Sequence, residues 1–309
     1  MTSWSGGLVE WTDGDIAYLS VVFSWQLQRA YSRAVWLRQQ GYHVRAGGPA
    51  VAINPTFLSS VAEIGGGVDA LAHHNPDATF TSRGCIRHCP FCAVPKIEGD
   101  LVELSDWEPH PIVCDNNLLA CSRAHFDRVI DRLKPIPGVD FNQGLDARLL
   151  TSYHAGRLAE LDLHCVRLAW DDTGMERQFL AAYQILRDAG IPARKIHVYV
   201  LIGYKDTPAD ALYRLTTVWS HGSFPNPMRY QPLDASRRNE YVAPAWTSRE
   251  LKRFSKYWSR LWWYKHIPFD EFQVSRSGWV RLDRLGACAR TASVNPRTNH
   301  EPLNHRSPR

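Results

Sequence analysis

The sequence has no long hydrophobic run, and no apolar stretch reaches the roughly 18 residues that a membrane-spanning helix needs. Residues 1–14 lack the basic start and apolar centre of a secretory signal peptide, so we expect none. Cysteine is scarce: the chain has seven in 309 residues, none of them before Cys85. They are not arranged as the disulfide framework of a small secreted protein. These absences argue against membrane and secreted proteins and predict a cytoplasmic location.

Charge is unevenly placed along the chain, whose formal net charge is +5. Residues 281–309 contain six arginines against Asp283 and Glu301, which gives this segment +4. The segment is also rich in Asn, Pro, Ser and Thr, so we expect a tail without fixed structure. A basic tail can contact phosphates, which makes nucleic acid a candidate partner; a merely solvated terminus is the alternative.

Three cysteines lie close together in Gly84–Cys92, where Cys85, Cys89 and Cys92 have the spacing Cys-x3-Cys-x2-Cys. A structural zinc site normally has four ligands, often as two separated Cys-x2-Cys pairs, and the sequence has no second pair. Three thiolates fit three irons of a [4Fe-4S] cluster and leave the fourth iron open. An open iron can bind a substrate or cosubstrate, so the loop predicts a reaction centre. Zinc with His88 as fourth ligand is the alternative.

The first part of the chain has the pattern of a βαβ unit. Residues 16–23 form an apolar run typical of a buried strand, and residues 25–40 have helical spacing that ends before Gly41. Residues 42–46 form a second strand that leads into Gly47-Gly48-Pro49. A strand, a helix and a strand over this length predict a parallel sheet. The glycines permit a tight turn or close approach of the backbone to a ligand.

From residue 78 onward, strand and helix patterns alternate, which predicts a second parallel α/β unit. Helical patterns cover residues 125–133, 149–161 and 178–189 and resume after Thr207, a plausible N-cap. Polar residues follow several strands and should gather at one edge of the sheet. The expected strands are 78–82, 111–114, 139–142, 164–170, 196–202 and 228–233.

The cysteine loop resembles the signature loop of the radical SAM superfamily, because aromatic Phe91 precedes the third cysteine. The flanks Arg83-Gly84, Ala93-Val94-Pro95 and Gly99-Asp100-Leu101 are most similar to methylthiotransferases and cobalamin-domain radical SAM enzymes. The resemblance implies a short Rossmann-like, cobalamin-binding-type N-terminal domain followed by a (β/α)6 partial TIM barrel. It also implies that the open iron chelates S-adenosylmethionine, whose reductive cleavage gives a 5′-deoxyadenosyl radical. The electron donor would be a protein such as flavodoxin or ferredoxin.

Two subfamily features are missing. Methylthiotransferases carry three N-terminal cysteines for a second cluster, and this chain has none before Cys85. The Asp-x-His-x-x-Gly motif, whose histidine would ligate cobalt, is also absent. The resemblance therefore favours an N-terminal domain that binds nothing. Some relatives bind cobalamin without that histidine, so a cobalamin-dependent radical SAM methyltransferase stays an alternative. A non-enzymatic zinc or iron–sulfur module that binds nucleic acid is another.

The resemblance also assigns contacts with the methionyl group of S-adenosylmethionine. Asp115, Asn116 and Asn117 occupy the place of the residues that hold the methionyl amine, and their acceptor oxygens suit an ammonium group. Arg148 matches an arginine that pairs with the methionyl carboxylate, for which its planar fork is suited. The plain alternatives are turn chemistry for the first three residues and a surface pair with Asp146 for Arg148.

The nucleoside half of S-adenosylmethionine has its own matches. Asp171 follows the fourth barrel strand, where an acidic residue commonly binds the ribose hydroxyls, although it could simply cap a helix. Phe91 and Gly203 lie where ring or backbone contacts the adenine. Four further cysteines carry no assigned role, and those in apolar strands should behave as small buried hydrophobes. These four are Cys114, Cys121, Cys165 and Cys288.

The C-terminal part combines aromatic and basic residues in a helical pattern over residues 247–267. Such residues can stack bases and hold phosphates, but they can equally cover the barrel edge, which is the interpretation that we favour. The predicted organisation has four parts. They are the Rossmann-like domain (1–75), the radical SAM barrel (76–240), the aromatic helical segment (241–280) and the basic tail (281–309).

Overall fold

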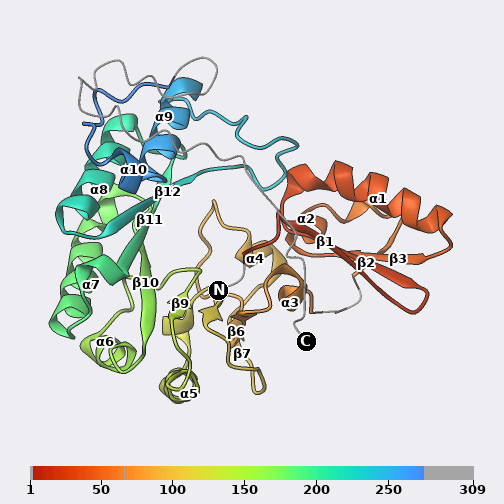
Figure 1. The fold of residues 1–309 in the computed structure, drawn as a ribbon, viewed down its shortest axis with the longest axis horizontal. Helices are drawn as coiled ribbons and strands as arrows, with labels where there is room; N and C mark the ends of the chain where they lie inside the picture. Colours follow the sequence, from red (N-terminus) through yellow and green to blue (C-terminus); the bar gives the residue numbers. More distant parts are fainter. Residues whose placement is uncertain (1–2, 66, 68, 275–309) are drawn as a thin grey trace, which may run out of the picture.

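The computed structural model describes residues 3–65, 67 and 69–274, so the basic tail and Cys288 lie outside the described residues. The fold is mixed α/β and contains a four-stranded and a six-stranded sheet (Figure 1). Each sheet has its own hydrophobic core, one within residues 17–61 and a larger one within residues 107–274. Within the described residues, no helix combines the length and apolar character needed to cross a membrane.

The four-stranded sheet confirms the predicted βαβ unit. Strands β2 (Ile16–Val21) and β3 (His43–Gly47) are parallel, and α1 (Leu27–Gln39) connects them after the short 3₁₀ helix η1 (Ser24–Gln26). Strand β4 (Glu63–Ile64) continues the parallel order on the far side of β3. Strand β1 (Leu8–Asp13) pairs antiparallel with β2 and was not predicted. It is a half-exposed edge strand without the apolar run that marks a buried one.

The six-stranded sheet is parallel throughout, and its strands follow one another in the order of the sequence from β5 to β12. Helices α5, α6, α7 and α8 lie along its outer side (Figure 1). Among the described residues no pairing joins β5 to β12, so the sheet is not closed into a barrel. The strands are β5 (Ala78–Thr79), β8 (Ile112–Val113), β9 (Val139–Phe141), β10 (Leu163–Ala169), β11 (Ile196–Ile202) and β12 (Phe224–Arg229). The helices are α5 (Arg123–Leu133), α6 (Ser152–Leu158), α7 (Glu176–Asp188) and α8 (Pro208–Ser220).

The alternation of residues along the strands divides the sheet into an apolar and a polar face. On β10 and β11, every second residue, such as Leu168 and Val200, is buried in the core. The residues between them include Arg167 and Tyr199, which lie on the other face. The helices therefore cover the apolar face, and the polar face lies on the inner side of the sheet, opposite the helices.

Two predicted strands are placed differently in the structure. The last strand was expected at 228–233, but β12 covers Phe224–Arg229 and contains Pro225 and Pro227. Proline has no backbone N–H with which to pair with a neighbouring strand. The two prolines are tolerated because β12 is at the edge of the sheet. At the other edge, the chain leaves the sheet after Thr79 and forms β6 (Ser82–Arg83), which pairs antiparallel with β7 (Val102–Glu103). This small ribbon brackets the cysteine loop.

The aromatic C-terminal segment forms α9 (Ser248–Trp258) and the short α10 (Leu261–Tyr264). The inner face of α9 is packed, since Phe254, Tyr257 and Trp258 are each 5% exposed or less. The packing interpretation fails at Trp262 and Trp263, whose exposed fractions are 62% and 78%.

Short elements connect the two sheets around the cysteine loop. Helix α2 (Pro49–Ile53) packs against α4 (Val94–Ile97), which follows the third cysteine directly (Figure 1). Gly48, just before α2, has φ +94°, and a Cβ there would lie 2.7 Å from the backbone oxygen of Val21. The predicted need for glycine at the end of β3 therefore comes from close approach of β2. Other short elements are η2 (Pro55–Phe57), α3 (Leu71–His74), η3 (Leu118–Ala120), η4 (Thr173–Met175) and η5 (Ala193–Lys195).

Candidate functional site

The cysteine loop is held by a backbone reversal that requires glycine. Gly84 has φ +73°, and a Cβ at this position would lie 2.0 Å from the backbone oxygen of Asp100. The Gly84 amide donates to the Glu98 carboxylate at 2.8 Å, and the Cys85 amide donates to the Gly99 carbonyl at 3.2 Å. The start of the loop is therefore fastened to the segment that follows it.

Two of the three residues expected to hold the methionyl amine are engaged in fixing this loop. Asp115 is 4% exposed and accepts from the Thr81 amide at 2.6 Å, from the Thr81 hydroxyl and from the Ser82 hydroxyl at 2.8 Å. Asn116 donates to the Glu98 carboxylate at 2.8 Å. Burial raises the pKa of Asp115, and the donors from Thr81 and Ser82 oppose that rise. These bonds make Asp115 and Asn116 supports of the loop.

Asn117 is the member of the trio that reaches the cysteines. It is 2% exposed, and its Nδ2 lies 3.5 Å from both the Cys85 sulfur and the Asp146 carboxylate. Its Oδ1 is buried and has no hydrogen-bond partner among the described residues. A buried acceptor without a donor is costly and is rare in native proteins. The arrangement thus offers an acceptor to a donor from outside the chain, beside Cys85.

Arg148 pairs with Asp146, as the plain alternative required, but the pair lies at the cysteine loop. Arg148 donates to both Asp146 oxygens at 2.6 and 3.0 Å, and Arg87, from within the loop, donates at 3.0 Å. Burial would raise the pKa of Asp146, yet the arginine donors outweigh it and the pKa lies below its usual range. The charge of Arg148 also opposes the rise that burial causes in the pKa of the Cys89 thiol.

The cysteines and Asp171 are electrostatic neighbours. Burial raises the pKa of the Cys89 and Cys92 thiols, and the charges of Asp171 and Cys85 raise both further. Burial raises the pKa of Asp171 to about 6, against the opposing charges of Arg214 and Arg148. The charges of Asp171 and of the loop cysteines therefore influence one another.

The donor set of this loop, three cysteine thiols, is of the kind that ligates an iron–sulfur cluster. Within the described residues, no three His, Cys, Asp or Glu side chains converge as ligands of one metal ion. The zinc alternative, with His88, requires four ligands around one ion. A [4Fe-4S] cluster with an open iron takes three thiolates, which is the number of cysteines in this loop.

The expected adenine contacts, Phe91 and Gly203, lie close together in the structure, because Phe91 packs on the residue after Gly203. The ring of Phe91 packs edge-to-face with that of Tyr204, with centroids 5.6 Å apart. Gly203 has φ +73°, and a Cβ there would lie 2.6 Å from the side chain of Leu251 on α9. Asp206 accepts from the amides of Gly203 and Tyr204 at 2.8 and 3.2 Å. The turn that faces Phe91 is therefore fixed by its own carboxylate.

Arg214 supports this turn from below and was missed from the sequence. It is fully buried on α8 and donates to the backbone oxygens of Trp170 and Asp171 at 2.9 and 2.7 Å. It also donates to Asp206 at 2.6 Å. One side chain thus joins the ends of β10 and β11. The sequence did offer a signal for this role: Arg214 is a charged residue on the face of the helix where Leu215 and the other apolar residues lie.

The polar face of the sheet below the site carries a second unpredicted group. Arg167 donates to both oxygens of Asp140, at 2.7 and 2.5 Å, and the Tyr199 hydroxyl donates to the Asn142 carbonyl at 2.7 Å.

Burial raises the pKa of Cys165 to about 12, so its thiol stays protonated. The same holds for buried Cys114, also at about 12, and burial raises Cys121 to about 11. Cys114 and Cys165 are 1% and 0% exposed, as expected of cysteines in apolar strands.

A cavity lies at the ends of β2 and β3 in the four-stranded sheet. Its volume is about 230 Å³, and its lining includes Trp11, Tyr18, Gly47 and Gly48. Ligand cavities commonly begin at about 300 Å³, so this space is small even for a drug-sized molecule.

Comparison with known proteins does not extend this description. No protein-family model matches the chain, and no curated protein matches it. The function has to be inferred from the arrangement of the residues.

The burial of Asp171 predicts a pH-dependent gain in stability when it is neutralised. Below about pH 4 the carboxyl is protonated in both the folded and the unfolded chain, whereas above about pH 6 both are ionised and burial is most costly. Asp171→Asn should therefore raise the free energy of unfolding near pH 7 by up to about 3 kcal/mol, and hardly at all near pH 4. Urea unfolding of the metal-free chain, followed by tryptophan fluorescence, measures both. Asp106→Asn is the control, because Asp106 is exposed and its charge is not among those that act on Asp171; equal gains for Asp171→Asn at both pH values would contradict the account.

Proposed function

We propose that the chain is a radical SAM enzyme that holds a [4Fe-4S] cluster on Cys85, Cys89 and Cys92. S-adenosylmethionine would bind between this loop and the carboxyl ends of the six-stranded sheet. The proposal implies a partial (β/α)6 barrel with a short Rossmann-like domain before it. The parallel strand order and the outer helices support that interpretation.

The observation that carries the proposal is the surroundings of Asn117. Its Nδ2 contacts the Cys85 sulfur, while its Oδ1 is buried without a partner among the described residues. An ammonium group beside the cysteine loop would supply the missing donor. The α-amine of S-adenosylmethionine is such a group. Asn117 is therefore the proposed amine ligand, with Asp115 and Asn116 fixing its position.

The remaining residues of the site fit the other parts of the same molecule. When bound, the cluster would supply the electron that cleaves the sulfonium and yields a 5′-deoxyadenosyl radical. The pair with Asp146 uses Nε and one terminal nitrogen of Arg148, so the donors of the other terminal nitrogen face no competition from that carboxylate. They would bind the methionyl carboxylate. Phe91 and the Gly203-Tyr204 turn would enclose the adenine.

Asp171 would accept hydrogen bonds from the ribose hydroxyls. Burial raises the pKa of Asp171 because water does not stabilise its ionised carboxylate well. Hydrogen bonds from ribose hydroxyls would stabilise that ionised form. Arg214 would position it through the backbone oxygen of Asp171. Substrate would then approach over the polar face that carries Arg167 and Tyr199.

A cobalamin-dependent methyltransferase is the second candidate, because glycines line the cavity at the ends of β2 and β3. The small volume of that cavity favours an N-terminal domain that binds nothing. Retention of a corrinoid after cobalamin loading would favour the second candidate. The remaining alternative, a non-enzymatic zinc or iron–sulfur module, predicts no affinity for S-adenosylmethionine.

Anaerobic reconstitution tests the proposed function directly. The chain should bind about four irons and, with dithionite as reductant, convert S-adenosylmethionine to 5′-deoxyadenosine. Replacing Cys85, Cys89 and Cys92 together by alanine should abolish both. A colourless protein with one equivalent of zinc would contradict the proposal.

The backbone reversal at Gly84 should decide whether the loop can hold iron. Gly84→Ala would force a Cβ into the Asp100 carbonyl, so we expect its iron content to fall to a small fraction of the wild-type value. Gly99→Ala is the matched control, because Gly99 has the same φ of +73° but open space around the added Cβ. Both variants carry the strain of a left-handed alanine, about 1–2 kcal/mol, and only the first carries the clash. Equal iron content in the two variants would show that the reversal does not position the cysteines.

The fork of Arg148 should matter for the cosubstrate and not for the cluster. Arg148→Lys removes the planar donor pair, so we expect affinity for S-adenosylmethionine to fall by about tenfold or more, with iron content unchanged. Equilibrium dialysis with the reconstituted protein measures this affinity. Arg33→Lys is the control, since Arg33 also makes a two-pronged pair, with Glu10 on the other sheet. Unchanged affinity in the Arg148→Lys protein would remove this residue from the site.

A further inference from the structure

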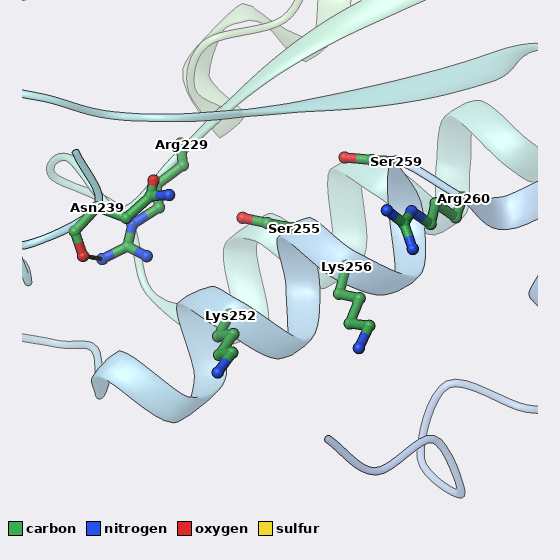
Figure 2. Close-up of a pocket in the computed structure, with 7 residues that line it drawn as sticks. All are labelled: Arg229, Asn239, Lys252, Ser255, Lys256, Ser259 and Arg260. Carbon is green, nitrogen blue, oxygen red and sulfur yellow. Dashed lines mark hydrogen bonds between the residues drawn. The ribbon is translucent and has the colours of Figure 1, made fainter. Parts of the chain in front are cut away.

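A basic groove lies between α9 and the end of β12, outside the candidate active site. Figure 2 shows its lining, and the groove has a volume of about 510 Å³. This volume is within the usual range of ligand cavities. Four of the lining residues are basic, and none of the described lining residues is acidic. The lining consists of Arg229, Asn239, Lys252, Ser255, Lys256, Ser259 and Arg260.

Three of the cations lie on α9 or just after its end. Lys252 and Lys256 are four residues apart on α9, which places them on one side of the helix, and Arg260 comes two residues after the helix ends. The side chains of Lys252 and Lys256 extend from the same side of α9 in Figure 2. The opposite side of α9, with Leu251 and Phe254, is buried in the core. Like charges at this spacing repel one another, so an anion along the row would be stabilising.

Two buried polar atoms of the groove have no hydrogen-bond partner among the described residues. They are Nε of Arg229 and Oγ of Ser255. The Arg229 guanidinium is held in place, because Nη2 donates to the carbonyls of Asn239 and Tyr241 at 2.8 and 2.9 Å. A guanidinium fixed in this way, with Nε left over, is suited to an oxyanion such as phosphate.

Two exposed aromatic residues come shortly after the cations in the sequence. Trp262 and Trp263 lie two and three residues after Arg260 on the short helix α10 and are 62% and 78% exposed. The ammonium of Lys265 lies 3.7 Å from the centre of the Trp262 ring. Aromatic faces next to a row of cations are the arrangement that binds single-stranded nucleic acid, with phosphates on the cations and bases stacked on the rings.

We propose that this groove binds a single-stranded nucleic acid, with phosphates along Arg229, Lys252, Lys256 and Arg260 and bases on the two exposed tryptophans. The alternative ligand for a basic surface, an acidic polypeptide, would leave the rings unused. The proposal does not depend on the cysteine loop. Because α9 also packs on Gly203 through Leu251, a bound strand would lie on the helix that borders the candidate active site.

Fluorescence anisotropy of the full chain tests this proposal with labelled single-stranded RNA and DNA of about 20 nucleotides, longer than typical single-strand sites. The variant Lys252→Gln, Lys256→Gln, Arg260→Gln should bind about 100-fold more weakly. Its dependence of log affinity on log salt should be less steep by about two, since three phosphate contacts are lost. Trp262→Ala with Trp263→Ala should weaken binding about tenfold without changing that salt dependence.

The control replaces exposed arginines away from the groove, as Arg29→Gln, Arg177→Gln, Arg194→Gln, and removes the same charge. It should bind almost as the wild type does. Absence of binding by the wild type, an equal loss in the control, or equally strong competition by polyglutamate would each overturn the proposal. The groove variants should keep their iron and their cleavage of S-adenosylmethionine, so failure here is distinct from failure of the proposed function.

Discussion

Buried carboxylates hold the candidate site together. The sulfur-bearing loop has little regular secondary structure of its own, so its position depends on acceptors that reach it from other elements. Glu98 binds the Gly84 amide, Asp115 binds Thr81 and Ser82, and Asp146 binds Arg87 and Arg148. Removing a charge from water is costly unless it gains several donors, and each of these carboxylates has them. The rest of the site is built outward from this framework.

The number of hydrogen-bond donors that each buried group receives within the chain separates the groups that support the site from those that are open to a ligand. Asp146 and Asp206 have donors from arginine, and Asp115 has hydroxyl and amide donors, so their bonding capacity is largely used within the chain. Asp171 is buried enough that its pKa rises to about 6, and Asn117 has a buried oxygen without a partner among the described residues. Costs of this kind are tolerated at binding sites, where a ligand supplies what the fold does not.

Local patterns predicted much of the fold. Buried apolar residues recur along the strands around Val166 and Val198, and Thr207 forms a capping box with Asp210, as a helix start should. The contacts within the site were less accessible, because they join residues far apart in the chain. Arg87 meets Asp146, for example, and nothing in either neighbourhood announces the pairing. The start of β12 was missed because Pro225 and Pro227 are unusual in a strand. The aromatic residues of 247–267 were treated as one group, but some of them pack in the core and Trp262 and Trp263 are exposed.

The central claim is that one iron beside Asn117 and Arg148 binds the methionyl end of S-adenosylmethionine. Electron–nuclear double resonance of the reduced, reconstituted protein tests it most directly, with S-adenosylmethionine labelled by ¹⁵N at the amine and ¹³C at the carboxylate. The account predicts magnetic coupling of both labels to the cluster. A cluster signal that the labelled cosubstrate leaves unchanged would contradict it.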